Sequence, residues 1–348
     1  MPKRVTAEII HTNLLEHPAV KAWSELRPAR VAPERIEVLR ERQKVSHKAT
    51  VYRLAGVGLA SSAVIAKRRP QASAVIERTI YEEVLPHLPM TALHYYGFVE
   101  EPDRTFGWLF LEDAGSEEYS PYIGEHRALA AQWLGLMHTS AACVAAADRL
   151  PDRGLGHYLE HLRSGRDRIL RNLANPALKV DDLAVLRSIV SQCAILESHW
   201  SQMERLCEGL PRTLVHGDFT GKNLRVRTGQ VGIALLPFDW EMAGWGVPAA
   251  DMAQSARLDR GDFSAKRRTF SANPDVATYW SVVREHWPSL DLRTIQQLAN
   301  CGKMFRSLAA INWEAYSLSY EWVERAMGHM RIYQAELADA IRTAPWAQ

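Results

Sequence analysis

The stretch LVHGDFTGKNLRVRTGQVGIALLPFDWEMAG, residues 214–244, constrains the fold more than any other part of the sequence. It contains two short apolar runs, 224–227 and 231–238, joined by Thr228-Gly229-Gln230. Short apolar runs separated by a glycine-containing turn are typical of a β-hairpin. We therefore predict a hairpin here, in a part of the chain that otherwise has helical periodicity.

Three oxygen-bearing side chains border this hairpin: Asp218 and Asn223 precede it, and Asp239 follows it. Polar groups at strand ends project from a backbone that the flanking apolar residues hold rigid. Mg²⁺ suits such groups, because it usually takes one or two carboxylates together with substrate phosphates. A phosphoryl-transfer site needs one carboxylate that deprotonates the attacking hydroxyl, and an amide and a second carboxylate that hold the metal. Asp218 fits the first role, and Asn223 and Asp239 fit the second.

The first third of the chain has the periodicity of strands, with one helix among them. The predicted strands are residues 36–42, 50–54, 63–67, 93–99 and 105–112. Residues 73–85 place apolar side chains at helical spacing, and Pro86 and Pro89 end this helix. This order of elements predicts an α+β fold around a mostly antiparallel sheet.

A polar segment, residues 113–118, marks the predicted boundary between this region and the rest of the chain. Beyond it helical periodicity dominates, apart from the hairpin. The predicted helices are residues 125–142, 155–174, 181–210 and further segments after Asn273. The second region is therefore expected to be mostly helical.

Length and composition exclude several classes of protein. A chain of 348 residues predicts two domains or one large two-lobed unit. With 42 Lys and Arg against 40 Asp and Glu, no charge excess points to nucleic acid or to an anionic membrane. The 4 cysteines have no metal-site spacing, and no window reaches the ~20 apolar residues of a membrane span. We expect a soluble, cytoplasmic protein, whose oligomeric state the sequence leaves open.

The motif HGDFTGKN, residues 216–223, followed by DWE, residues 239–241, resembles the signature of the aminoglycoside phosphotransferase and choline kinase family. Three further segments resemble the inter-lobe hinge, the first large-lobe helix and the segment after the metal-binding Asp. They are LFLED at 109–113, LGLMH at 134–138 and GWGVPAADMA at 244–253. Together these matches cover most of residues 36–255.

The resemblance implies a two-lobed, protein-kinase-like α+β fold and the transfer of a phosphoryl group to a small molecule. The implied cofactors are ATP, or alternatively GTP, and Mg²⁺. Within this fold we expect an N-terminal helical extension at 1–35, a nucleotide-binding lobe at 36–113 and a helical catalytic and substrate-binding lobe at 114–348.

The resemblance also implies roles for single residues of the two motifs. Asp218 becomes the catalytic base, and Asn223 and Asp239 become the metal ligands. His216 supports the catalytic loop by packing and hydrogen bonding rather than by proton transfer. Asp251 either braces this loop or caps a helix, and Lys222 lies either close to the transferred phosphate or in solvent.

The nucleotide is expected to bind the first lobe. The run VIAK, residues 64–67, is an apolar strand that ends in a lysine, as kinases use to neutralise the α- and β-phosphates. Lys67 needs a carboxylate from the following helix: Glu77 matches the family pattern, and Glu82 and Glu83 are alternatives. Adenine is expected to lie against the hinge, which includes three predicted contact residues: Phe110, Glu112 and Asp113.

The loop that should cover the phosphates departs from the usual kinase pattern. Kinases often make this loop glycine-rich, so that backbone amides approach the phosphates. Here it reads VSHKA, residues 45–49, without glycine. The side chains of Ser46 and Lys48 are the predicted phosphate contacts instead, with His47 covering the phosphate as the alternative.

The acceptor is expected to bind between the catalytic loop and the C-terminal helices. The candidate contact residues are Lys222, Glu241, Trp313, Glu314 and Glu321. Carboxylates beside aromatic faces could hold a cationic amine, but an amphipathic helix with buried aromatic residues gives the same pattern. Aminoglycosides, other amino sugars, choline-like amines, neutral sugars and macrolides all stay open as acceptors.

Two other functions remain to be weighed against the kinase. A nucleotide-binding regulatory module with a kinase fold and little turnover would explain the glycine-free loop at 45–49. A helical interaction protein would require the ordered motif matches to be accidental. A serine hydrolase is excluded, because the sequence contains no Gly-x-Ser-x-Gly motif.

Overall fold

The computed structural model describes residues 8–27, 32–40, 50–229, 232–255 and 271–347. The chain forms two compact units. Unit 1 comprises Met1–His87, Thr91–Glu117 and Arg225–Met242, and unit 2 comprises Leu88–Met90, Glu118–Leu224 and Ala243–Gln348. The hairpin region is thus grouped with the N-terminal strands, although it lies between helices in the sequence.

Unit 1 is built on a six-stranded sheet of order β1-β2-β3-β4-β6-β5 in which all neighbours are antiparallel. Its strands are β1 Glu8–Ile10, β2 Ile36–Arg40, β3 Thr50–Leu54, β4 Val64–Pro70, β5 Tyr95–Glu100 and β6 Phe106–Glu112. The antiparallel α+β class is confirmed. The sequence did not predict β1, because three residues are too few to show alternation. The predicted loop at 45–49, with Ser46 and Lys48, lies outside the described residues.

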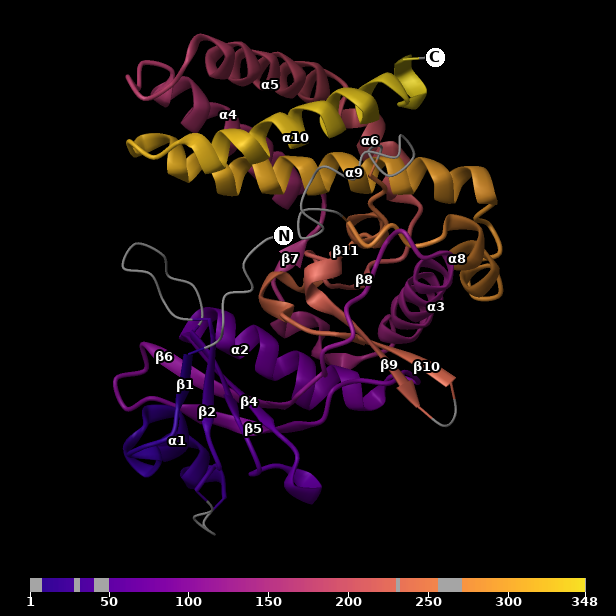
Figure 1. The fold of residues 1–348 in the computed structure, drawn as a ribbon. Coiled ribbons are helices and arrows are strands. Elements are labelled where there is room, and N and C mark those ends of the chain that lie inside the picture. The colour runs from indigo at the N-terminus through magenta and orange to yellow at the C-terminus, as the bar shows by residue number, and fades with distance from the viewer. Residues whose placement is uncertain (1–7, 28–31, 41–49, 230–231, 256–270, 348) are drawn as a thin grey trace. The chain divides into compact units, whose positions relative to one another are not determined.

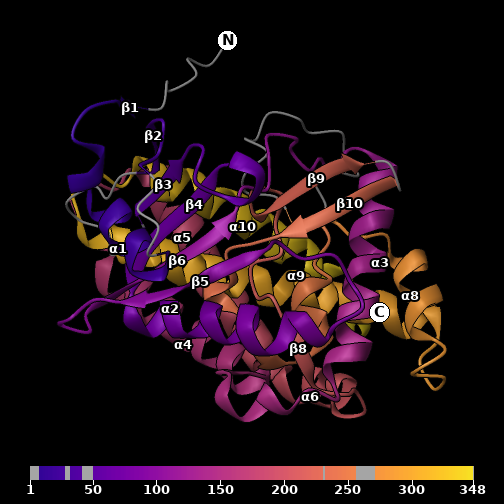
Figure 2. The ribbon, with the colours of Figure 1, turned by 90° about the horizontal axis from the view of Figure 1, so that it is seen from below.

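Helices lie against both faces of β4. Helix α1, Pro18–Leu26, packs its Trp23 into a core with Val64 and Ala66 of β4. Because side chains alternate along a strand, Lys67 and Arg69 point to the opposite face. Helix α2, Gln71–Thr79, contacts β4, β5 and β6 (Figure 2). The predicted helix at 73–85 is therefore confirmed in position, but it begins earlier and changes to a π-helical turn at Ile80–Val84.

The predicted hairpin is confirmed as β9, Leu224–Gly229, paired with β10, Gly232–Pro237 (Figure 2). After β10 the chain makes a sharp turn at Asp239, whose φ of 71° lies in the left-handed region. Aspartate tolerates this region better than most residues do. The short 3₁₀ helix η7, Trp240–Met242, follows and contacts α2. This turn therefore places Asp239 and Glu241 beside α2.

Unit 2 is mostly helical. Its helices are α3 Gly124–Ala141, α4 Leu155–Asn172, α5 Val180–Ser198, α6 Trp200–Glu208, α8 Val276–Val283, α9 Leu292–Ala315 and α10 Glu324–Arg342. Helix α9 packs against α4 and α10 along much of its length (Figure 1). The single helix predicted at 181–210 is wrong: α5 and α6 are separate, because His199 has φ −105° and ψ 10°.

A three-stranded sheet of order β7-β11-β8, whose strand β8 ends directly before the predicted catalytic loop at residues 216–223, lies in unit 2. Its strands are β7 Asp152–Arg153, β11 Gly244–Gly246 and β8 Thr213–Val215. The 3₁₀ helix η8, Pro248–Asp251, lies so close to α9 that a Cβ on Gly302 would come within 2.0 Å of the Ala249 carbonyl oxygen. Gly302 therefore permits the close approach that fixes η8.

The remaining short helices of the described residues join these elements. They are η1 Leu14–Glu16, η2 Leu59–Ser61, η4 Leu85–His87, η5 Ala145–Arg149, η6 Gly221–Asn223, η10 Tyr316–Ser319 and η11 Pro345–Ala347. In the part of the chain that the structure describes, no helix combines the length and apolar character that a membrane span requires.

Candidate active site

The lysine at the end of the predicted VIAK strand forms a buried ion pair in unit 1. Lys67 of β4 donates to both carboxylate oxygens of Glu77 of α2, at 2.8 and 3.1 Å. Glu77 is 0% exposed, and a buried carboxylate needs a cationic partner such as Lys67 to offset the loss of hydration. The structure thus selects Glu77 among the three glutamates considered, since Glu82 instead accepts hydrogen bonds from Arg78 and Tyr95.

A second cation, Arg69, joins this pair to the turn after the hairpin. Its guanidinium contacts Glu77, lies 3.2 Å from Oδ1 of Asp239 and 2.8 Å from Oε2 of Glu241. Lys67 also reaches Oδ1 of Asp239, at 2.5 Å. Two cations therefore face three carboxylates in one buried network. Burial, together with the nearby charge of Asp239, raises the pKa of the Glu241 carboxyl.

We expect Arg69→Met to lower the free energy of unfolding by about 3 kcal/mol, because it leaves three carboxylates around Lys67 alone. Urea denaturation of the full chain measures this loss. Adding Glu241→Gln should restore part of it, since it removes one unpaired charge. The matched control is Arg68→Met on the same strand, where the pair with Glu101 is partly exposed and about 1 kcal/mol is expected. Equal losses in the two variants would contradict the buried network.

The predicted hinge residues are held by other parts of unit 1. Phe110 is buried against Trp23 of α1, with ring centroids 5.3 Å apart, so only its backbone is left for a nucleotide. Glu112 pairs with Arg227 of β9 at 2.7 Å. Asp113 pairs with Arg53 of β3 at 2.7 Å. These contacts give both carboxylates a structural role in joining β6 to its neighbours.

In unit 2, Asp251 holds the start of the catalytic loop. Its carboxylate accepts hydrogen bonds from the backbone N–H groups of His216 and Gly217, at 2.6 and 2.9 Å. Gly217 has a φ of +74°, a conformation that glycine adopts without strain. His216 is 0% exposed and lies edge-on to Phe219. These contacts place Asp218 at the end of a fixed turn.

Asp251→Asn should lower the free energy of unfolding by about 2 kcal/mol, because a carboxamide offers one acceptor oxygen in place of two charged ones. It should also speed hydrogen exchange at the backbone amides of His216 and Gly217. Hydrogen-exchange mass spectrometry of the full chain measures this. Asp167→Asn, at an exposed position of α4, is the control. Unchanged protection of the two amides would show that Asp251 does not brace the loop.

Three side chains converge on the carboxylate of Asp218. Asn223 donates to its Oδ2 at 3.0 Å and to its backbone carbonyl at 2.9 Å. Lys222 lies 2.7 Å from Oδ2, and Arg306 of α9 lies 3.1 Å from Oδ1. Burial alone would raise the pKa of Asp218, but the charges of Arg306 and Lys222 outweigh it and lower that pKa below its ordinary value. Asp218 is therefore ionised at neutral pH.

Lys222→Met should raise the pKa of Asp218, because it removes one of the two charges that favour the carboxylate. A lowered pKa in the folded state stabilises the protein above the unfolded value of about 3.9, and this stabilisation is lost as pH falls. Lys222→Met should therefore lose part of this stabilisation. The acid limb of any activity that needs ionised Asp218 should move up, by about one pH unit. An unmoved limb in kcat/KM profiles would contradict the role given to Lys222.

The two predicted metal ligands have donor atoms that fit Mg²⁺. Asp239 supplies a carboxylate from unit 1. Asn223 of unit 2 uses its N–H groups toward Asp218, so its amide oxygen is the atom suited to a hard cation. Within the described ranges, no group of three or more His, Cys, Asp or Glu is arranged so that it could by itself hold a metal ion. A carboxylate oxygen and an amide oxygen are each donors that Mg²⁺ accepts beside phosphate oxygens and water.

The predicted acceptor contacts are distributed over different environments. Glu241 is part of the Arg69 network of unit 1, and Lys222 pairs with Asp218. Glu314 accepts a contact from His329 at 2.7 Å, and Glu321 is exposed. The ring of Trp313 lies 5.6 Å from the guanidinium carbon of Arg306. Of these five residues, Lys222 contacts Asp218 directly, and Trp313 contacts Arg306, which pairs with Asp218.

Sequence reasoning missed Arg69 and Arg306, the two arginines that complete these networks. Arg69 carried a usable signal, because it lies two residues after Lys67 on a strand and so shares its face. Arg306 carried none, since its position in a long helix resembles that of any other basic residue. Both contacts depend on residues distant in the chain.

The fold and these residues define a kinase-like α+β protein, and comparison with known proteins agrees. The model of the phosphotransferase enzyme family (APH) matches residues 46–294. The chain therefore belongs to the phosphotransferase enzyme family, which confirms the resemblance seen in its motifs. No curated protein sequence is significantly similar to it.

Solved structures with similar folds include three kinases. A GDP complex of aminoglycoside 2′-phosphotransferase-IIIa has a TM-score of 0.59 at 12% identity, covering 93% of this chain and 99% of that one. Spectinomycin phosphotransferase with ADP and spectinomycin has 0.55 at 11%, covering 90% and 94%. Ethanolamine kinase from Plasmodium vivax has 0.52 at 14%, covering 88% and 82%. At these identities the likeness shows a shared fold.

Proposed function

We propose that this chain is a Mg²⁺-dependent O-phosphotransferase that moves the γ-phosphoryl group of a nucleoside triphosphate to a hydroxyl of a small molecule. The observation that carries this proposal is Asp218, a buried carboxylate kept ionised by Arg306 and Lys222. Its Oδ1 makes no hydrogen bond, and its ion-pair contact is with Nη1 of Arg306 at 3.1 Å. A general base must be ionised and must have an oxygen that can accept a proton, and Oδ1 is the oxygen of Asp218 that no hydrogen bond engages.

Each residue has a defined part in the proposed reaction. Oδ1 of Asp218 accepts the proton of the acceptor hydroxyl as that oxygen forms a bond to the γ-phosphorus. The bond from this phosphorus to the β–γ bridging oxygen breaks, and the nucleoside diphosphate leaves. Lys67, oriented by Glu77, neutralises phosphate charge. Asn223 and Asp239 would hold Mg²⁺, which when bound offsets the charge on the phosphate oxygens.

Both ATP and GTP are candidates for the nucleotide. The aminoglycoside 2′-phosphotransferase-IIIa structure is a GDP complex, whereas the spectinomycin phosphotransferase structure contains ADP. Ser46 and Lys48 remain our proposed phosphate contacts in the glycine-free loop. The first test is a thermal shift of the full chain with ATP and with GTP, each with and without Mg²⁺. Stabilisation that requires Mg²⁺ is expected for at least one of the two nucleotides.

The second test is transfer itself. The full chain is incubated with the stabilising nucleotide, Mg²⁺ and panels of sugars, hydroxy acids, amino sugars, cholines and macrolides, and products are read by mass for one added phosphoryl group. A product that disappears in Asp218→Asn supports the kinase. Nucleotide stabilisation without any product supports the regulatory module that the glycine-free loop at 45–49 favours. The absence of any nucleotide response contradicts both functions.

A further inference from the structure

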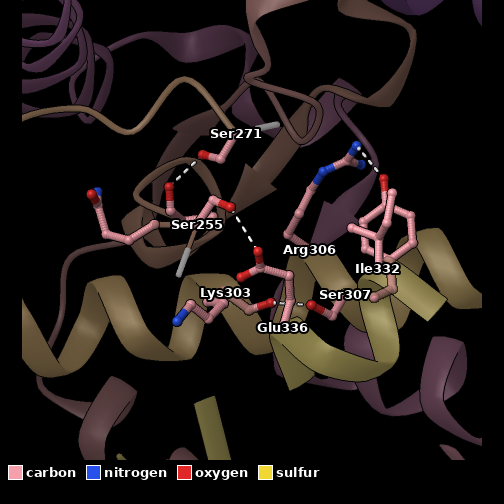
Figure 3. Close-up of a pocket in the computed structure, with 10 residues that line it drawn as sticks. Ser255, Ser271, Lys303, Arg306, Ser307, Ile332 and Glu336 are labelled. Carbon is pink, nitrogen blue, oxygen red and sulfur yellow. Dashed lines mark hydrogen bonds between the residues drawn. The ribbon is translucent and has the colours of Figure 1, made fainter. Parts of the chain in front are cut away.

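A small cavity of unit 2 is lined in part by Arg306, the residue that pairs with Asp218. Its volume is about 20 Å³, which is room for about one water molecule or one oxygen-bearing group. Residues of α9, α10 and two neighbouring segments line it (Figure 3). The lining includes Ser255, Ser271, Lys303, Arg306, Tyr333 and Glu336. A group of a bound molecule that entered this cavity would lie beside Arg306, whose Nη1 is 3.1 Å from the carboxylate of the proposed base.

Arg306 is the one lining side chain with clearly unused donors. Its side chain is 12% exposed, and Nη2 makes a single long hydrogen bond, 3.3 Å to the hydroxyl of Tyr333. Nε and Nη1 are buried without a hydrogen-bond partner, although Nη1 lies 3.1 Å from Oδ1 of Asp218. A guanidinium carries five N–H donors, and leaving buried charged donors unsatisfied is unfavourable. A missing oxygen acceptor is therefore indicated at this place.

The other charged groups of the lining are already engaged. Lys303 forms an ion pair with Asp339 at 2.6 Å, and Glu336 accepts a hydrogen bond from Ser255 at 2.7 Å (Figure 3). Oδ1 of Asp218, in contrast, has no hydrogen-bond partner. Nη1 of Arg306 and Oδ1 of Asp218 thus form an ion pair at 3.1 Å in which neither atom makes a hydrogen bond. The molecule that fits both presents one hydroxyl donor and, directly beside it, one oxygen acceptor.

We propose that the acceptor is a polyol or a hydroxy acid: its reacting hydroxyl donates to Asp218, and an oxygen on the neighbouring carbon accepts from Arg306. This inference rests on the proposed function, since it assigns the acceptor of the same reaction. A hydroxyl on the neighbouring carbon and a carboxylate both present the oxygen acceptor that Arg306 requires. A 1,2-amino alcohol does not fit, because its ammonium would face a guanidinium of like charge.

Two aromatic residues of α9 and η10, Trp313 and Tyr316, also argue against a cationic amine. Cation binding by aromatic side chains needs an open ring face. The guanidinium of Arg168 lies 3.7 Å from the ring centroid of Tyr316, and that of Arg306 lies 5.6 Å from that of Trp313. The protein's own cations therefore occupy these two rings.

Three small probes that share a hydroxyl test the proposal: glycerate with a carboxylate, glycerol with a neutral vicinal hydroxyl, and ethanolamine with an ammonium. Their binding to the full chain without nucleotide is measured by ligand-observed NMR at equal concentrations. We expect glycerate or glycerol to bind more tightly than ethanolamine. Tighter binding by glycerate assigns a hydroxy acid, and equal binding by glycerol assigns a polyol. Tighter binding by ethanolamine, or no binding by any probe, overturns the proposal.

Variants connect this binding to Arg306. Arg306→Gln should weaken the preferred probe about tenfold and reduce the preference over ethanolamine, since it removes the positive charge. If Arg306→Gln does not fold, Arg306→Lys is measured instead. This variant keeps the positive charge beside Asp218, so a smaller loss of probe affinity is expected. Arg163→Gln, at an exposed ion pair on α4, is the control and should leave probe binding unchanged. Unchanged probe binding in both Arg306 variants contradicts the assignment.

The outcomes separate this inference from the proposed function. Phosphoryl transfer to amino alcohols alone would refute the acceptor assignment and leave the kinase standing. Arg306-dependent probe binding without transfer from any nucleotide would support the acceptor assignment and refute the kinase.

Discussion

Asp218→Asn is expected to lower kcat by about 10³-fold, while nucleotide affinity changes by less than about twofold. The amide keeps the shape of the side chain but cannot take the proton of the acceptor hydroxyl. Lys222 and Arg306, which lie 2.7 and 3.1 Å from the carboxylate oxygens, lose a charged partner. The variant should therefore also unfold at a lower temperature, so turnover is measured well below its melting temperature.

The comparison that isolates the chemistry uses Asp167→Asn, which makes the same change at an exposed position of α4. Both variants are assayed for nucleotide binding by titration calorimetry and for turnover by product mass. Retained turnover in Asp218→Asn, with Asp167→Asn normal, would show that another group accepts the proton.

The second large effect is expected for Asp239→Asn, which should weaken Mg²⁺-nucleotide binding about 100-fold. An amide is a poorer ligand than a carboxylate because it brings no negative charge. The fold should tolerate this change, since Lys67 and Arg69 then face two carboxylates, Glu77 and Glu241, and no buried charge is left uncompensated.

A measurement without nucleotide tests the effect of the Asp239 charge on its neighbour Glu241. Because the charge of Asp239 contributes to the raised pKa of Glu241, Asp239→Asn should lower that pKa toward its ordinary value. Carbon NMR of the side-chain carboxyl follows this titration in the full chain. Asp103→Asn, in an exposed turn of unit 1, is the control. An unchanged Mg²⁺ requirement in Asp239→Asn would count against Asp239 as a ligand.

Much of unit 1 could be predicted from the sequence because its signals are local. The VIAK strand, the following helix and the alternation of side chains together indicate that Lys67 meets a carboxylate of that helix. In the structure Lys67 donates to both carboxylate oxygens of Glu77. The hairpin was equally readable, since its two apolar runs are separated by a single turn.

The remaining features depend on contacts that no local pattern encodes. Helical periodicity continues through His199, so the end of α5 is visible only in its backbone angles. Arg306 meets Asp218 because α9 passes the catalytic loop, and that packing depends on the absence of a side chain at Gly302. The acceptor assignment follows from Arg306 and was therefore not available from the sequence.

The proposed function requires that Asn223 and Asp239 both bind the Mg²⁺ that accompanies the nucleotide. Electron paramagnetic resonance of Mn²⁺, used in place of Mg²⁺ with a non-hydrolysable ATP or GTP analogue, measures this directly. We predict that Asn223→Ala and Asp239→Asn each weaken Mn²⁺ binding at least about tenfold, with a non-additive loss in the double variant. Full Mn²⁺ affinity in either single variant, or losses that simply add, would contradict a shared ion.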